Sequence, residues 1–299
     1  MSADYHKASN ITTVCASCGV AEIDHVKLKE CDNCDLVRYC SDECQKNHRS
    51  EHDDACKKRA AELRDEMLFK QPEGTHLEDC PICCLPLSLE MEESGMHMCC
   101  SKVICKGCDY ANRTRVVKMR LRLSCPFCRE PLPEPGESRK LLMKRIEAND
   151  PVAIRHEGIK HYHKRDYHSA FEYLSKAAEL GDLEAHCKLA CLYQMGHGVE
   201  KDKEKEIFHF EEAAIGGHPF ARYVLGSMEW NNFNMDRAVK HWIIAATQGD
   251  DDAIKVLMGA FKQGYVEKED LASALRAHKA AVDATKSPQR EAAEKYRRK

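Results

Sequence analysis

Cysteine and histidine give this sequence its most distinctive chemistry, and the cysteines are unevenly placed. The chain has 299 residues, with 18 cysteines and 16 histidines. All but two of the cysteines lie between Cys15 and Cys128, and only Cys187 and Cys191 lie beyond. Cysteine thiolates and neutral imidazoles are the ligands that zinc prefers, in tetrahedral groups of four. We therefore expect a metal-dependent N-terminal part and a cysteine-poor C-terminal part.

The first cluster contains four pairs of potential ligands. They are Cys15 and Cys18, Cys31 and Cys34, Cys40 and Cys44, and His52 and Cys56. A two-residue gap suits a tight knuckle that turns both sulfurs inward, whereas a three-residue gap places both ligands on one face of a helix. A segment this short cannot build an adequate core alone. Bound metal must therefore supply folding free energy, about 10–16 kcal/mol per structural zinc in small fingers.

The run from Tyr39 to Gln45, followed by His52 and Cys56, resembles the MYND zinc finger. That resemblance implies interleaved ligation, with one zinc on Cys15, Cys18, Cys40 and Cys44 and another on Cys31, Cys34, His52 and Cys56. His48 lies on the same helix face and is a rival to His52. MYND fingers commonly bind short proline-containing peptides against a glutamine and a tryptophan. Gln45 fills the first position, but Arg49 stands at the second, so an aromatic wall is replaced by a charged stem.

The second cluster again contains four pairs, namely Cys80 and Cys83, Cys99 and Cys100, Cys105 and Cys108, and Cys125 and Cys128. Three Cys-x-x-Cys knuckles in so short a segment predict zinc. Their order resembles the RING finger, which implies one zinc on Cys80, Cys83, Cys105 and Cys108 and another on Cys99, Cys100, Cys125 and Cys128. The family's usual histidine position falls on Lys102. His97 is therefore a competitor of Cys99 for the third place in the second group.

RING fingers can act as ubiquitin-protein ligases that hold a charged conjugating enzyme in a reactive pose without covalent chemistry of their own. The resemblance implies that Ile82 and Pro126 contact the conjugating enzyme and that Arg129 bridges it to ubiquitin. The alternative is that Ile82 and Pro126 only shape their knuckles and that Arg129 is solvated.

A run of five cations between Arg113 and Arg122 alternates with apolar residues between Val116 and Leu123. This alternation favours a half-buried strand or helix with a solvated basic face over a site for phosphate or an acidic protein.

From residue 151 onward the sequence repeats. Paired alanines followed by glycine occur at 177–185, 213–221 and 245–253, with a worn copy at 280–284. The period predicts a solenoid of helix pairs, in which each glycine ends a helix in a left-handed conformation. These repeats resemble the Sel-one-like family, relatives of tetratricopeptide repeats. Such a solenoid usually offers a concave surface to another protein.

We therefore predict a multidomain chain, with two small zinc-stabilised α+β fingers followed by an all-α solenoid of helix-pair repeats. The expected segments are a disordered N-terminus at 1–14, a MYND-like finger at 15–56, a helical linker at 57–78, a RING-like finger at 79–130, a proline-containing linker at 131–150, Sel-one-like repeats at 151–285 and a basic tail at 286–299. Each finger is expected to hold two zinc ions.

Composition narrows the functional classes. Lys and Arg total 46 and Asp and Glu total 49, for a net charge of −3, so we do not expect a nucleic-acid-binding protein. We see neither a membrane-spanning run nor a signal peptide, and we expect a reducing compartment, cytosol or nucleus, where cysteines stay free for zinc. MYND fingers also occur in SET methyltransferases, but helical repeats fill the space that a SET domain would need. The predicted function is a zinc-binding adaptor whose partners are proteins or peptides. The alternative is a RING-type ubiquitin ligase that binds a conjugating enzyme and uses the repeats to select substrate.

Overall fold

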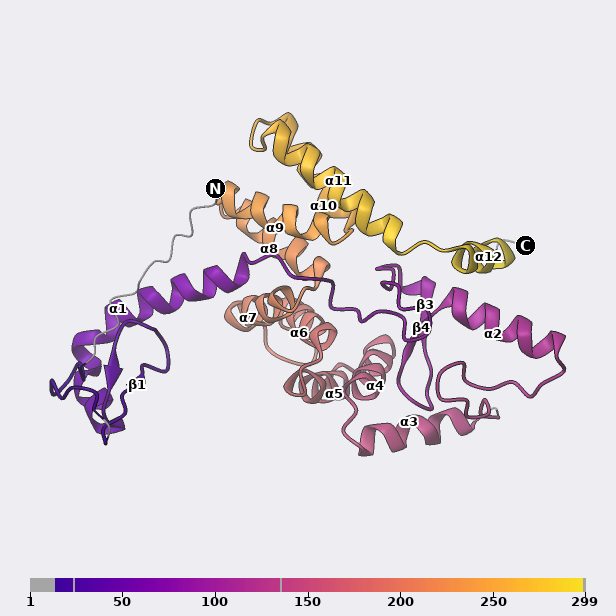
Figure 1. Cartoon of the computed structure of the whole chain (residues 1–299), viewed down its shortest axis with the longest axis horizontal. Coiled ribbons are helices and arrows are strands. Elements are labelled where there is room, and N and C mark those ends of the chain that lie inside the picture. The colour runs from indigo at the N-terminus through magenta and orange to yellow at the C-terminus, as the bar shows by residue number, and fades with distance from the viewer. Residues whose placement is uncertain (1–13, 24, 135, 298–299) are drawn as a thin grey trace. The chain divides into compact units, whose positions relative to one another are not determined.

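The computed structural model describes residues 14–23, 25–134 and 136–297, which divide into two compact units, Met1–Lys70 and Gln71–Lys299 (Figure 1). The disordered segment predicted at 1–14 lies outside the described residues except for Val14, which forms a β-bridge with Ala21. Within the described ranges, no helix is both long and apolar enough to cross a membrane.

The first unit is a small hairpin followed by a long helix. Strands β1 (Lys29–Glu30) and β2 (Arg38–Tyr39) pair antiparallel, and helix α1 (Asp42–Leu68) follows at once. Ser41 caps α1 by accepting a hydrogen bond from the backbone N–H of Cys44. Because α1 is continuous, the finger shares one helix with the linker predicted after it.

The second half of α1 is fastened to the finger by one arginine. Arg59 donates two hydrogen bonds to Asp35, at 2.7 and 2.8 Å, in the paired geometry that guanidinium and carboxylate favour. Glu62 and Glu66 accept further hydrogen bonds from the same guanidinium. The helix ends at Leu68, so the remainder of the predicted helical linker, up to residue 78, is not helical.

The second unit begins with an irregular, cysteine-rich segment. A short 3₁₀ turn (Met91–Glu93) leads into strand β3 (Ser94–Met96), which pairs antiparallel with β4 (Val103–Cys105). Helix α2 (Lys106–Lys118) starts directly after β4. The sheets of both fingers are two-stranded and small, as expected of folds that depend on metal.

The rest of the second unit is a succession of helices (Figure 1). Their bounds are α3 Glu137–Glu147, α4 Pro151–His163, α5 Tyr167–Glu179, α6 Leu183–Met195, α7 Lys203–Ile215, α8 Pro219–Asn231, α9 Met235–Thr247, α10 Asp251–Lys262, α11 Lys268–Ala284 and α12 Pro288–Arg297. Helices α4 to α9 all have 13 residues, as expected of a repeated unit.

The junctions between repeats use the same backbone device three times. A glycine with positive φ ends one helix, and these glycines are Gly181, Gly217 and Gly249. The next residue caps the following helix by accepting a hydrogen bond from the backbone N–H three residues on, and these caps are Asp182, His218 and Asp250. The alanine that donates is fully buried each time. The left-handed glycine predicted from the sequence is thus observed at each junction.

The packing of the solenoid begins before the predicted boundary at 151. Helix α3 lies in the segment predicted as a linker, and it buries Leu142 and Ile146 in the same core as Ala153 of α4. Asn149 takes the left-handed position and Asp150 caps α4, which reproduces the repeat junction with asparagine in place of glycine. The linker predicted at 131–150 is therefore too long, because α3 belongs to the core of the solenoid.

Candidate metal centres

The first unit gathers the eight predicted MYND ligands into two groups. One contains Cys15, Cys18, Cys40 and Cys44, and the other contains Cys31, Cys34, His52 and Cys56. Within these groups, the Sγ atoms of Cys18 and Cys40 are 3.5 Å apart, and those of Cys40 and Cys44 are 3.6 Å apart. The Sγ atom of Cys34 lies 3.2 Å from Nε2 of His52.

The second unit gathers the RING-like cysteines in the same interleaved manner. One group contains Cys80, Cys83, Cys105 and Cys108, and the other contains Cys99, Cys100, Cys125 and Cys128. The Sγ distances are 3.8 Å from Cys83 to Cys105, 3.9 Å from Cys100 to Cys125 and 3.4 Å from Cys99 to Cys128.

These distances fit ligands that share one metal ion. Two sulfurs bound tetrahedrally to zinc at about 2.3 Å stand about 3.8 Å apart. A disulfide would require about 2.05 Å. The type, the number and the spacing of the donors therefore suit zinc in all four groups.

The competing ligands lie outside the groups. His97 directs Nε2 toward Asp109 Oδ1, at 3.9 Å, while Cys99 is with the other sulfurs. His48 stacks on His52 with ring centroids 5.7 Å apart, and its Nδ1 lies 3.1 Å from the hydroxyl of buried Tyr39. His48 thus packs beside His52 and is paired with Tyr39, outside the metal group.

Three knuckles share one hydrogen-bond pattern. The residue after the second cysteine is left-handed and donates its N–H to the carbonyl of the first cysteine; these residues are Gly19, Cys84 and Arg129, at 2.9, 2.8 and 3.0 Å. The first cysteine of each knuckle donates its N–H to a carbonyl five residues on. This turn directs both sulfurs to the same side, which explains the two-residue gap.

Gln45, which was predicted to contact peptide, and Arg49, which replaces the tryptophan of the family, lie in different surroundings. The Gln45 amide donates to Asp32 Oδ2 at 3.4 Å and approaches Cys31 Sγ at 3.9 Å, so it contacts a ligand knuckle. Arg49 is exposed on α1.

Three RING-like residues line one groove, and one of them, Ile82, comes from a loop far in sequence from the other two. Ile82, Pro126 and Arg129 line a hollow of about 470 Å³, together with Ala111 and Asn112 of α2. Asn112 Nδ2 donates to the Ser124 carbonyl at 3.0 Å, which ties α2 to the second metal loop. Gln289 of α12 lines the same groove, a residue that sequence spacing gave no means of finding.

The apolar residues that alternate with the basic run were predicted to be half-buried, and this prediction was wrong for all but the first of them. Val116 is buried, but Val117 and Met119 are 76% and 62% exposed, and Leu121 and Leu123 are also exposed. The reason is that α2 ends at Lys118, so the alternation lies on a helix end and a loop that nothing covers among the described residues.

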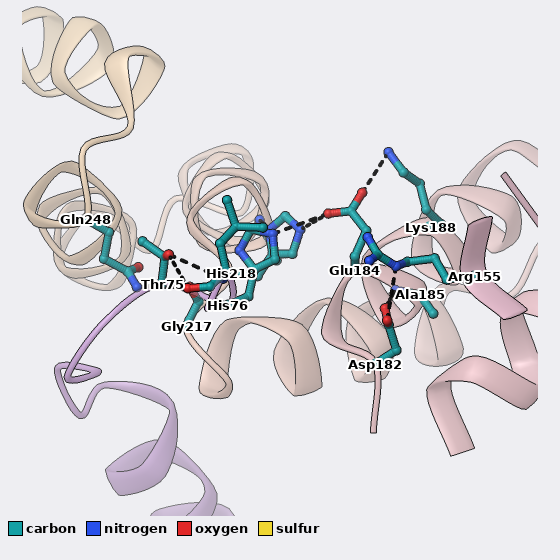
Figure 2. Close-up of polar contacts among 12 residues, drawn as sticks. Thr75, His76, Arg155, Asp182, Glu184, Ala185, Lys188, Gly217, His218 and Gln248 are labelled. Carbon is teal, nitrogen blue, oxygen red and sulfur yellow. Dashed lines mark hydrogen bonds and ion pairs between the residues drawn. The ribbon is translucent and has the colours of Figure 1, made fainter. Parts of the chain in front are cut away.

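A further group of potential ligands joins the start of the second unit to the solenoid (Figure 2). Nε2 of His218 and Nε2 of His76 lie 2.9 and 3.4 Å from the same oxygen of Glu184, and the two imidazole rings stack with centroids 3.8 Å apart. The other oxygen of Glu184 contacts Lys188 at 3.2 Å. We call His76, Glu184 and His218 the histidine clasp.

The chemistry of the histidine clasp favours hydrogen bonds over a metal. The backbone N–H of Ala221 donates to Nδ1 of His218, which leaves the ring proton on Nε2, facing Glu184. A metal-bound histidine usually donates from its second nitrogen, yet Nδ1 of His76 is buried with no hydrogen-bond partner among the described residues. The ammonium of Lys188 further disfavours a cation. The sequence contains one sign of this group: His218 occupies the capping position that Asp182 and Asp250 occupy at the other junctions.

Comparison with known proteins supports this organisation. The family model described as the MYND finger matches residues 15–56, and that described as the Sel1 repeat matches 153–182, 183–218 and 225–250. Residues 15–56 are thus a MYND finger, and Sel1 repeats occupy 153–250, a shorter span than the predicted 151–285. A putative RING finger protein of Ostreid herpesvirus 1 is 36% identical over 53 residues, which cover 18% of this chain and 22% of the viral protein.

Solved structures of repeat proteins match about half of this chain. A Sel1 repeat protein from Oxalobacter formigenes has a TM-score of 0.44 at 27% identity and covers 52% of this chain and 69% of its own. A protective antigen of uropathogenic Escherichia coli with an SLR fold has a TM-score of 0.43 at 22% identity and covers 51% and 34%. By the two family models, the chain is a cysteine-rich finger region followed by a helical-repeat region, and its modules are those of a zinc-binding, protein-interacting scaffold.

Proposed function

We propose that this chain is an adaptor that brings proteins together through two zinc-organised fingers and a helical solenoid. The observation that carries the proposal is the gathering of sixteen ligands, from eight pairs spread along the sequence, into four groups of zinc-like geometry. In this proposal zinc is structural and fixes the loops that contact partners. The adaptor works in a reducing compartment, the cytosol or nucleus, where thiolates remain free to bind metal.

The repeats offer at least one exposed aromatic contact. Phe233 lies in the tight turn between α8 and α9, with 84% of its surface exposed and a left-handed backbone. A large apolar residue gains nothing from burial there and is disfavoured at positive φ. Such a residue is typical of a partner contact, and it stands where an earlier repeat has the Gly196 to Gly198 loop.

The adaptor proposal is tested by proximity labelling of partners with the whole chain and two variants. Cys40→Ser disrupts the first finger, and Phe233→Asn removes the aromatic contact in a backbone that asparagine tolerates. Each variant is expected to lose a different subset of the labelled proteins. If both variants retain the full set seen with the unaltered chain, the proposal fails.

The second candidate function is that of a ubiquitin-protein ligase. The groove lined by Ile82, Pro126 and Arg129 favours it, because these are the residues that the RING resemblance assigns to the conjugating enzyme and ubiquitin. Ile82 is 40% exposed, so its side chain is available to a partner. The RING-like part would supply position, not a reacting group.

Ubiquitin transfer with a broad panel of conjugating enzymes tests this candidate. Ile82→Ala is expected to abolish binding of the conjugating enzyme without loss of zinc. Arg129→Ala is expected to slow transfer while leaving that binding intact, and Arg129→Lys to be impaired as well because lysine lacks the planar set of donors. If the unaltered chain transfers no ubiquitin with any enzyme of the panel, the ligase candidate is excluded.

A further inference from the structure

The C-terminal helix α12 packs on the RING-like finger, although it was predicted to be a basic tail. Its Ala293 is buried, and the rings of Tyr296 and Tyr110 lie 5.2 Å apart. Gly107, near the start of α2, makes the approach possible, because a Cβ there would stand 2.8 Å from the backbone nitrogen of Arg290. The helix therefore lies at the loop that carries the first metal group of this finger.

The Arg290 side chain is held by several acceptors of that loop. Nη1 donates to the carbonyl of Pro86 at 2.6 Å, and Nη2 donates to the carbonyl of Leu85 at 3.2 Å. The same Nη2 lies 3.5 Å from Sγ of Cys83, within hydrogen-bond range of a sulfur. Nη1 also donates to the carbonyl of Thr285, just before α12, at 2.6 Å. One guanidinium thus connects the end of the chain to a predicted zinc ligand.

The chemistry of a four-thiolate zinc site gives this contact a role. Four thiolates around Zn²⁺ leave a net charge of about −2, which destabilises the bound state wherever water is excluded. A guanidinium near one sulfur offsets this charge, and its N–H donor fixes the direction of the sulfur lone pairs. Residues in such outer-shell positions typically change metal affinity by about 10–100-fold.

We propose that Arg290 is a positioning residue for the zinc site formed by Cys80, Cys83, Cys105 and Cys108, so that α12 sets how tightly the RING-like finger holds its first metal. The inference rests on the zinc occupancy that is part of the proposed function. It adds that a residue of the far end of the sequence, 207 positions from Cys83, is part of the site.

Metal release from the full, zinc-loaded chain tests this inference. A chromogenic chelator is added together with N-ethylmaleimide, and mass spectrometry of quenched samples then reports which cysteines have lost zinc. For Arg290→Gln we expect the group of Cys83 to be alkylated about 10-fold faster or more, with the other three groups unchanged. Arg290→Lys keeps the positive charge on a single ammonium. Its rate of alkylation at the Cys83 group is expected to lie between those of the unaltered chain and of Arg290→Gln.

The matched control is Arg297→Gln on the same helix. Arg297 pairs with Glu92 and Glu93 and has no hydrogen bond to a sulfur among the described residues, so release is expected to match the unaltered chain. Unchanged release in Arg290→Gln, or equal acceleration in Arg297→Gln, overturns the inference. If Arg290→Gln does not fold by circular dichroism, Arg290→Lys decides, and unchanged release in that variant overturns it. If the Cys83 group of the unaltered chain reacts at once, zinc occupancy itself is refuted.

Discussion

Replacement of Glu184 by Gln tests whether the histidine clasp holds the start of the second unit on the solenoid. The carboxylate accepts hydrogen bonds from two histidines and pairs with Lys188, and its side chain is only 17% exposed. Glutamine has nearly the same shape but offers one acceptor oxygen and no charge. Hydrogen bonds to charged groups contribute about 1.5–3 kcal/mol each. We expect the free energy of unfolding to fall by about 2 kcal/mol, which lowers the Tm of a unit of this size by about 4–8 °C.

The same clasp predicts the direction of a pH effect. Burial lowers the pKa of His76 below its ordinary value of 6.5, although contact with Glu184 opposes this. Burial alone would raise the pKa of Glu184, but hydrogen bonds from His218 and His76 lower it. At His76 and Glu184 the unfolded chain therefore binds more protons than the native one below about pH 6.5, so the contribution of these two groups to stability is complete above that pH and declines as pH falls.

Calorimetry of the full chain at pH 7.5 and pH 5.5 provides the measurement. The matched control is Glu172→Gln, which removes an exposed pair with His168 and should change stability by less than about 0.5 kcal/mol. The reasoning would be refuted if Glu184→Gln left the Tm unchanged. It would also be refuted if Glu184 made the chain more stable at pH 5.5 than at pH 7.5. Loss of one bound metal ion in Glu184→Gln would instead show that the clasp is a metal site.

Three other outcomes follow from the structure. Cys99→Ser should release one zinc by elemental analysis, whereas His97→Ala should leave the zinc content unchanged; the reverse would move the ligand to His97. Phe233→Asn should raise the free energy of unfolding by about 0.5–1 kcal/mol in denaturant titration, because asparagine tolerates the left-handed backbone better. A destabilised variant would mean that Phe233 packs in solution. Gly107→Ala should loosen α12 and increase hydrogen exchange in 288–297, and protection equal to that of the unaltered chain would contradict its close approach to Arg290.

The predictable parts of this fold are those whose structure depends on residues close together in the sequence. Ligand spacing predicted the pairs of ligands, since a knuckle or a helical turn leaves little freedom in where two sulfurs point, whereas the interleaved grouping of those pairs was implied by the resemblance to MYND and RING fingers. The repeated glycine and alanine positions predicted the helix junctions, because left-handed backbone and close helix contact restrict residue type locally.

The parts that were missed depend on long-range packing. Helix α3 was not predicted because prolines precede it, although Leu142 and Ile146 are spaced four residues apart, as on one face of a helix. Helix α12 has a strongly charged sequence, and its place depends on contacts with residues about 180–200 positions away, such as Gly107. Arg290 has no motif of its own, so no sequence rule links it to Cys83.

The central claim is that zinc organises both fingers, and metal counting in the intact chain tests it most directly. Native mass spectrometry should find four zinc ions per chain. Stepwise chelation followed by hydrogen exchange should unfold residues 15–128 while the helices from α4 to α10 keep their protection. A chain that remains fully folded with two or fewer zinc ions would contradict the account.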